Sequence, residues 1–100
     1  MAGGGDLFIP HSDNVFHRWR QEHPSGFVLN VERTLNPNYM VAHRSTCLHI
    51  ASHPNPGAFT EHAYQKICAN DLTSLRNWVR RHGRSDGTFS QMCKTCSPSD

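Results

Sequence analysis

The chain has no long apolar segment and no export signal that we can recognise in its 100 residues. No stretch approaches the roughly 20 apolar residues that a membrane-spanning helix needs, so we expect no membrane partner. Residues 1–6 have neither the positively charged region nor the apolar region of a signal peptide. We therefore expect a cytoplasmic protein, in which cysteines stay reduced and metal binding is a better prediction than disulfides.

Hydrophobic residues are also few, at 36% of the chain, where average domains have roughly 45–50% on a count that includes glycine. The length suits one domain, and a core this lean makes a stabilising metal or partner more credible. The net charge is +2 with histidine neutral. This is less than the strongly basic character of an independent nucleic-acid binder, so the charge permits an anionic partner without requiring one.

Motifs of catalysis are absent as well, because the sequence has neither a glycine-rich phosphate loop nor a nucleophile elbow. His43 with Cys47 and His62 with Cys68 are the only sensible nucleophile–base pairs, and neither has local motif support. We therefore expect a binding domain and not an enzyme.

The hydrophobic periodicity predicts two helices and about three strands. The helices are expected at 14–22, after a cap at Ser12 or Asp13, and at 71–82, with Trp19 and Trp78 in the core. The strands are expected at 27–33, 39–43 and 64–69, and residues 47–50 could continue the second one. This pattern predicts an α+β fold, with a small antiparallel sheet covered by both helices on one face. A flexible leader, 1–12, would precede a single domain, 13–98, that ends in a polar, flexible tail.

What the sequence does contain is a Cys-x-x-Cys pair, Cys93 and Cys96, within that tail. Two thiolates at this spacing can hold one zinc ion from a tight turn, but zinc needs four ligands. His43 and Cys47, four residues apart at the end of a predicted strand, would supply the other two. We predict a C-terminal zinc knuckle with these four ligands.

Other interpretations of the cysteines stay open. His49 or Cys68 could replace His43 as a ligand. A redox pair normally opens a helix in a βαβ unit, unlike this one. The four cysteines could also bind no metal, with Cys47 and Cys68 as core residues, since a free cysteine behaves as a small hydrophobe.

The pattern His-x-x-x-Cys, helix, Cys-x-x-Cys-x-Pro resembles the zinc-binding N-terminal domain of the Ada DNA-repair proteins. His43, Cys47, Cys93, Cys96 and Pro98 stand at the matching places, over about residues 43–98. The resemblance implies a zinc-held fold that approaches a DNA backbone. In that family the first cysteine of the first pair accepts a methyl group, and because position 43 is histidine here, this chemistry does not carry over.

Arginine outnumbers lysine strongly, which favours phosphate or planar partners, because arginine forms bidentate bonds and stacks on bases. We predict contact with DNA or RNA through a face that contains Arg44, Arg76, Arg80, Arg81, Arg84 and Lys94. The alternative is a metal-free protein-interaction or regulatory domain, whose partner is another protein or a second copy of the chain.

Overall fold

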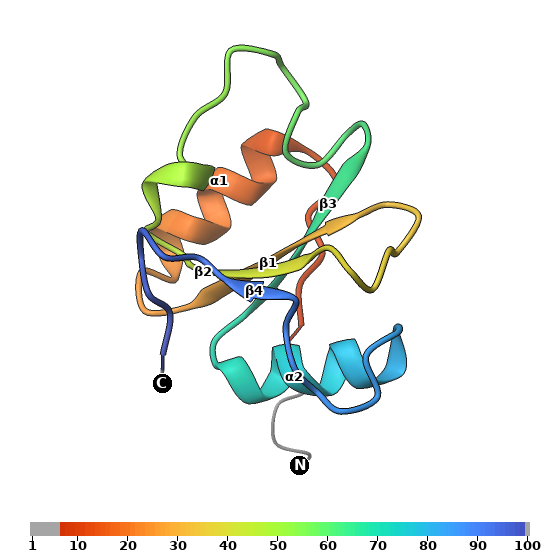
Figure 1. The fold of residues 1–100 in the computed structure, drawn as a ribbon. Coiled ribbons are helices and arrows are strands. Elements are labelled where there is room, and N and C mark those ends of the chain that lie inside the picture. Colours follow the sequence, from red (N-terminus) through yellow and green to blue (C-terminus); the bar gives the residue numbers. More distant parts are fainter. Residues whose placement is uncertain (1–6, 100) are drawn as a thin grey trace.

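The computed structural model describes residues 7–99 and contains two α-helices, four strands and one short 3₁₀ helix (Figure 1). In chain order these are α1 (Asp13–Glu22), β1 (Phe27–Glu32), β2 (Met40–Arg44), η1 (Leu48–Ile50), β3 (Tyr64–Ala69), α2 (Leu72–Arg81) and β4 (Gln91–Met92). The predicted α+β class and both predicted helices are confirmed. No helix in the described part of the chain has the length and apolar character needed to cross a membrane.

The sheet has four strands in the order β3-β1-β2-β4, with β1 antiparallel to both of its neighbours. β4 runs parallel to β2, along the edge that β2 would otherwise leave open. The sequence predicted about three antiparallel strands, so β4 is a correction. It is only two residues long, and a strand of that length has no alternation that a sequence pattern could reveal.

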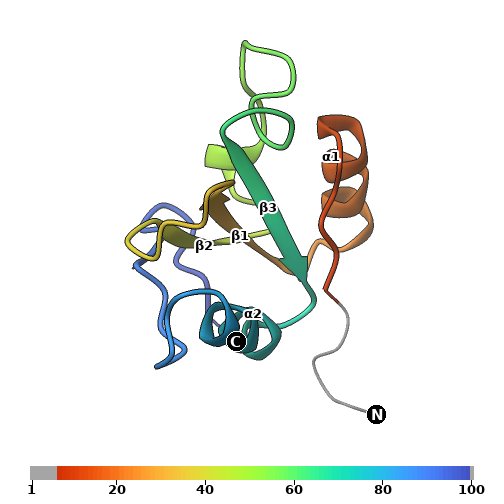
Figure 2. The same cartoon turned by 90° about the vertical axis from the view of Figure 1, so that its right-hand side faces the viewer.

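The two helices cover opposite faces of the sheet, because β1 is buried on both sides. Phe27, Leu29 and Val31 pack with α2, whereas Val28 packs with Phe16 of α1. Figure 2 shows α1 and α2 on different sides of the strands. The expectation that both helices cover one face was wrong, since it assumed that β1 has a single buried face.

Each helix begins at a residue that the sequence offered as a cap. Ser12 Oγ accepts a hydrogen bond from the first turn of α1 at 3.2 Å, and Asp71 Oδ1 accepts one from the first turn of α2 at 2.7 Å. Such caps satisfy N–H groups that have no partner inside the helix. Trp19 and Trp78 are both buried, as predicted.

Residues 47–50 do not continue β2, as the sequence analysis considered, and Leu48–Ile50 forms η1 instead. The Cys47 N–H donates to Arg44 O at 3.0 Å and the Ile50 N–H donates to Cys47 O at 3.2 Å. These local bonds occupy the groups that a ladder would have used. The chain therefore leaves the sheet at Arg44 and turns Cys47 back toward it.

The predicted leader falls partly outside the described residues, because 1–6 are not described. From Leu7 onward the segment contacts the domain. Phe8 exchanges two backbone hydrogen bonds with Cys68, at 2.9 and 2.8 Å, in an antiparallel bridge along β3. The chain therefore runs beside the outer edge of β3 before α1 begins.

The tail docks on β2 and positions Cys93. Ser90 Oγ accepts a hydrogen bond from the Met40 N–H at 2.7 Å and donates one to Met40 O at 3.0 Å. Three residues later the Cys93 N–H donates to Ala42 O at 2.8 Å. The sequence predicted a flexible tail here, whereas these bonds fix it against the strand that carries His43.

We predict that Ser90→Ala weakens the docking of the tail. It leaves the Met40 N–H without its acceptor and should lower the free energy of unfolding by about 1–3 kcal/mol. Urea denaturation monitored by tryptophan fluorescence measures this loss. Ser85→Ala is the matched control, because Ser85 is exposed in the same tail. Equal stability of the two variants would contradict the docking role of Ser90.

Candidate metal centre

Four metal-ligating side chains meet where the tail docks on β2. One ligand atom from each of His43, Cys47, Cys93 and Cys96 lies within 4.8 Å of the other three. His43 comes from β2, Cys47 from the turn before η1, and the other two from the segment after β4. These are the four residues that the sequence analysis proposed as ligands. The two halves of the pattern, 46 residues apart between Cys47 and Cys93, therefore meet in space.

The spacing of the sulfur atoms suits a tetrahedral zinc site. Cys47 Sγ and Cys93 Sγ are 3.8 Å apart and form no disulfide. With Zn–S bonds of about 2.3 Å, tetrahedral geometry places two sulfurs about 3.8 Å from each other. The pair is thus already at the separation that one shared ion requires.

His43 carries the clearest sign of a missing partner. Its side chain is 6% exposed, and Nδ1 is the one buried side-chain nitrogen or oxygen among the described residues without a hydrogen bond. Burial, together with the charge of Lys66 and the proximity of His49, lowers the pKa of His43 to about 4. The ring is therefore neutral near pH 7, which is the form that binds metal. A metal ion would satisfy the nitrogen that the protein leaves unpaired.

The Cys93–Cys96 turn is held by the backbone and by Arg44. The Ser97 N–H donates to Cys93 O at 2.9 Å, and Ser97 has a φ of 47°, in the left-handed region where glycine is more usual. The Arg44 N–H donates to Cys96 Sγ at 3.2 Å, and its guanidinium donates to Cys96 O at 2.9 Å. These bonds hold the turn against Arg44, and the Arg44 N–H helps to orient Cys96 Sγ.

The two facing thiols differ in how readily they ionise. Burial raises the pKa of Cys47. Burial also opposes ionisation of Cys93, but the backbone N–H groups of Cys96 and Thr95 and the neighbouring thiols together lower the pKa of Cys93. Thiolates are the form that binds metal. The N–H groups of the turn thus favour the charged form of Cys93.

His49 and Cys68, the other ligand candidates from the sequence, lie outside the four-residue group. Cys68 is fully buried in β3 and packs in the cluster with Val28, and burial raises its pKa to about 12. His49 contacts a ligand, since its Nδ1 lies 3.8 Å from Cys93 Sγ, while its Nε2 lies 3.1 Å from Thr95 Oγ1. This position suits a side chain that supports Cys93 from outside the group.

Two of the arginines predicted to contact nucleic acid form hydrogen bonds within the domain. Arg44 donates to the backbone oxygens of Cys96 and Ser97 at 2.9 and 3.0 Å. Arg84 donates to Pro37 O at 2.7 Å and to Thr88 O at 2.6 Å. The guanidinium groups of both are thus engaged within the domain.

The remaining four cations are divided between the two sides of the sheet. Arg76, on α2, lies over the Phe89 ring at 5.4 Å. Arg80 and Arg81, in the last turn of α2, are exposed. Lys94 is exposed beside the metal centre, on the face opposite α2. The structure does not gather the predicted set on one surface.

Sequence reasoning missed Lys66, which is 2% exposed and lines a cavity beside His43. A signal was present, because Lys66 and Cys68 are two residues apart in β3 and so share a face. Lysine is so seldom fully buried that this position alone would not have predicted it.

Comparison with protein-family models, curated proteins and solved structures gave no match. The geometry of this centre therefore carries the functional argument. The resemblance to the Ada domain stays a prediction, because none of these comparisons bears on it.

We predict that the protein, purified without added metal, contains about one zinc per chain. Cys96→Ser and His43→Gln should each reduce zinc retention by about tenfold or more, since each removes one of four ligands. Elemental analysis of the purified variants measures this. Cys68→Ala is the control and should retain zinc. Loss of zinc from Cys68→Ala but not from His43→Gln would show that the ligand set is wrong.

Proposed function

We propose that this protein is a small binding domain whose fold is stabilised by one zinc ion. The observation that carries the proposal is the convergence of three thiols and buried His43, whose Nδ1 has no hydrogen-bond partner among the described residues. Zinc binds through nitrogen and sulfur ligands of this kind in structural sites.

The ligand set supports a structural and not a catalytic role for the ion. Three cysteines and one histidine would fill all four positions of a tetrahedron, whereas catalytic zinc keeps one position for water. The centre joins three segments of the chain, namely β2, the turn at Cys47 and the tail. Metal binding would then contribute directly to the free energy of folding, which suits a core this poor in hydrophobic residues.

The proposed ligand of the domain is nucleic acid. The internal hydrogen bonds of some arginines leave fewer of the six predicted cations for this contact. Arg44 and Arg84 are engaged internally, and Arg80 donates to Asn77 Oδ1 at 2.6 Å. The exposed Arg81 is therefore the best candidate for phosphate contact. Arginine binds phosphate in bidentate geometry, and such contacts position a backbone without reading its sequence.

A second candidate function is protein binding, favoured by the exposure of Leu48. This side chain is 78% exposed on η1, directly after the metal ligand Cys47. A large, exposed apolar side chain on a short helical turn is suited to insertion into a partner. Self-association that persists at high salt would favour this candidate over nucleic-acid binding.

We predict that removal of zinc destabilises the domain strongly. A high-affinity chelator should lower the free energy of unfolding by at least about 3 kcal/mol, which corresponds to roughly 12–24 °C in melting temperature for a domain of this size. Calorimetry with and without chelator measures the change, and added zinc should restore the original transition. Cys96→Ser should respond little to the chelator. An unchanged melting temperature after complete zinc removal would contradict a structural role.

We predict that nucleic-acid binding, measured by fluorescence anisotropy with labelled oligonucleotides, weakens steeply with salt. Arg81→Ala should reduce the slope of log K against log salt by about 1, as one phosphate contact is lost. Arg18→Ala is the matched control, because Arg18 is an exposed arginine on α1, across the sheet. Equal effects of the two substitutions, or no salt dependence, would contradict a phosphate-binding site at the end of α2.

A further inference from the structure

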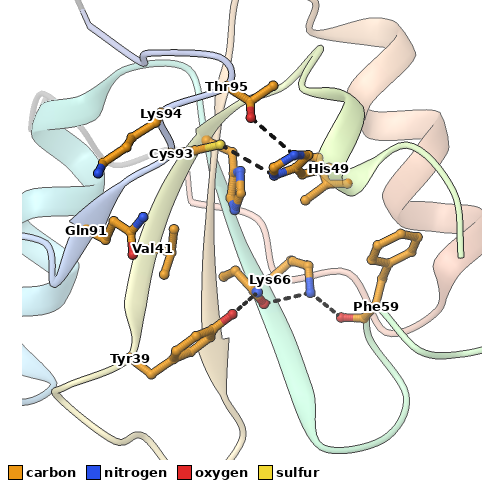
Figure 3. Close-up of a pocket in the computed structure, with 12 residues that line it drawn as sticks. Tyr39, Val41, His49, Phe59, Lys66, Gln91, Cys93, Lys94 and Thr95 are labelled. Atoms are coloured by element: carbon orange, nitrogen blue, oxygen red, sulfur yellow. Dashed lines mark hydrogen bonds between the residues drawn. The ribbon is translucent and has the colours of Figure 1, made fainter.

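A cavity of about 460 Å³ adjoins the metal centre on the α1 face of the sheet. Figure 3 shows its lining, to which β3 contributes Lys66, the residue before β2 contributes Tyr39, η1 contributes His49, and the tail contributes Lys94. Twelve residues line it, and none of them is an aspartate or a glutamate. Both lysines of the chain face this one space.

Lys66 forms the floor of the cavity as a buried cation. Its Nζ donates to Asn30 Oδ1 at 2.8 Å and to Phe59 O at 2.7 Å, and it lies 5.4 Å from the Phe59 ring centre. Burial lowers the pKa of Lys66 to about 8, while Asp13 acts in the opposite direction. The side chain therefore stays mainly protonated at pH 7. Both acceptors are neutral, so its charge has no hydrogen-bonded counter-ion among the described residues.

The contacts of Asn30 leave Tyr39 with an unused donor. Because the Lys66 ammonium can only donate, Asn30 must turn Oδ1 toward it, and Nδ2 then donates to the Tyr39 hydroxyl at 3.1 Å. The Tyr39 oxygen is an acceptor in this bond, so its own O–H must donate elsewhere. No acceptor for it is present among the described residues.

Lys66 has an unused donor for the same reason. An ammonium has three N–H groups, and two of them are occupied by Asn30 and Phe59. The third N–H, like the Tyr39 O–H, belongs to a side chain that lines the cavity (Figure 3). Unused donors of this kind, in a cavity without carboxylates, favour an acceptor with negative charge.

The negative charge of a zinc-loaded metal centre would not remove the preference of the cavity for an anion. A zinc ion with three thiolate ligands carries one net negative charge, which one lysine balances. The second lysine leaves the cavity with a positive charge. The aromatic rings of Tyr39 and Phe59 line the same cavity and can pack against an organic group.

We propose that this cavity is a binding site for a small molecule with a phosphate or carboxylate group, which accepts hydrogen bonds from Lys66 and Tyr39. The site is separate from the exposed arginines of α2, and neither of its two donors is one of the four candidate metal ligands.

The test is an NMR titration of the zinc-loaded full chain at constant ionic strength. The probes are inorganic phosphate, adenosine 5′-monophosphate and benzoate, with chloride as the reference anion. We expect saturable shifts of the amide signals of Asn30, Tyr39 and Lys66 with at least one oxyanion and none with chloride. Comparison of the three probes then identifies the ligand class. Binding of phosphate shows that the anionic group suffices, tighter binding of the nucleotide shows that an organic part contributes, and binding of benzoate shows that a carboxylate is accepted.

Substitutions connect the binding to the two donors. Lys66→Met should raise the dissociation constant about tenfold or more, and Tyr39→Phe, which removes a single oxygen, should raise it about threefold to tenfold. Arg18→Gln, an exposed loss of the same charge, should leave it unchanged. If Lys66→Met fails to fold, Tyr39→Phe still decides the question.

The proposal is overturned if no oxyanion gives saturable shifts, if chloride gives the same shifts, or if Tyr39→Phe binds as tightly as the unmodified protein. In those cases Lys66 is only a cross-link between β1, β3 and the segment at Phe59. Zinc content measured on the same samples keeps this result distinct from the proposed function. Full zinc occupancy without anion binding would overturn the cavity proposal alone.

Discussion

The architecture depends on one long-range closure, in which the tail lies along β2 and brings Cys93 and Cys96 to His43 and Cys47. Backbone pairing alone stabilises this closure only weakly, because β4 has only two residues. Hydrogen bonds from Ser90 and Arg44 add to it. The closure brings three thiols and one histidine together. Without an ion, the thiols would repel one another as thiolates and His43 Nδ1 would stay unpaired. A zinc ion would turn this weak closure into a strong one.

The position of the closure explains why the small chain can support helices on both faces of its sheet. One hydrophobic cluster, between the sheet and α2, contains mainly aliphatic residues and Trp78. The other, beneath α1, includes Cys47, Cys68 and Cys93 among its few members. The second layer is therefore completed by the candidate metal centre. The cavity with Lys66 opens in this same layer, where apolar packing is least extensive.

Local patterns predicted much of the fold and, from two short motifs, the candidate ligand set. Helices with capped ends and clear periodicity were predicted within one residue at each end, as for 13–22 and 72–81. The burial of β1 on both faces was not predicted, because Val28 is buried by α1, which no local pattern in β1 reveals. β4, the internal bonds of Arg44 and the burial of Lys66 depend on tertiary contacts that no local pattern records. The resemblance to Ada domains and the contact with nucleic acid remain predictions.

The central claim is that one zinc ion joins the two halves of the cysteine pattern, and X-ray absorption at the zinc edge tests it directly. For protein purified without added metal, the account predicts three sulfur neighbours at about 2.3 Å and one nitrogen at about 2.0–2.1 Å. A zinc shell of nitrogen and oxygen alone, or folded protein without any zinc signal, would contradict it.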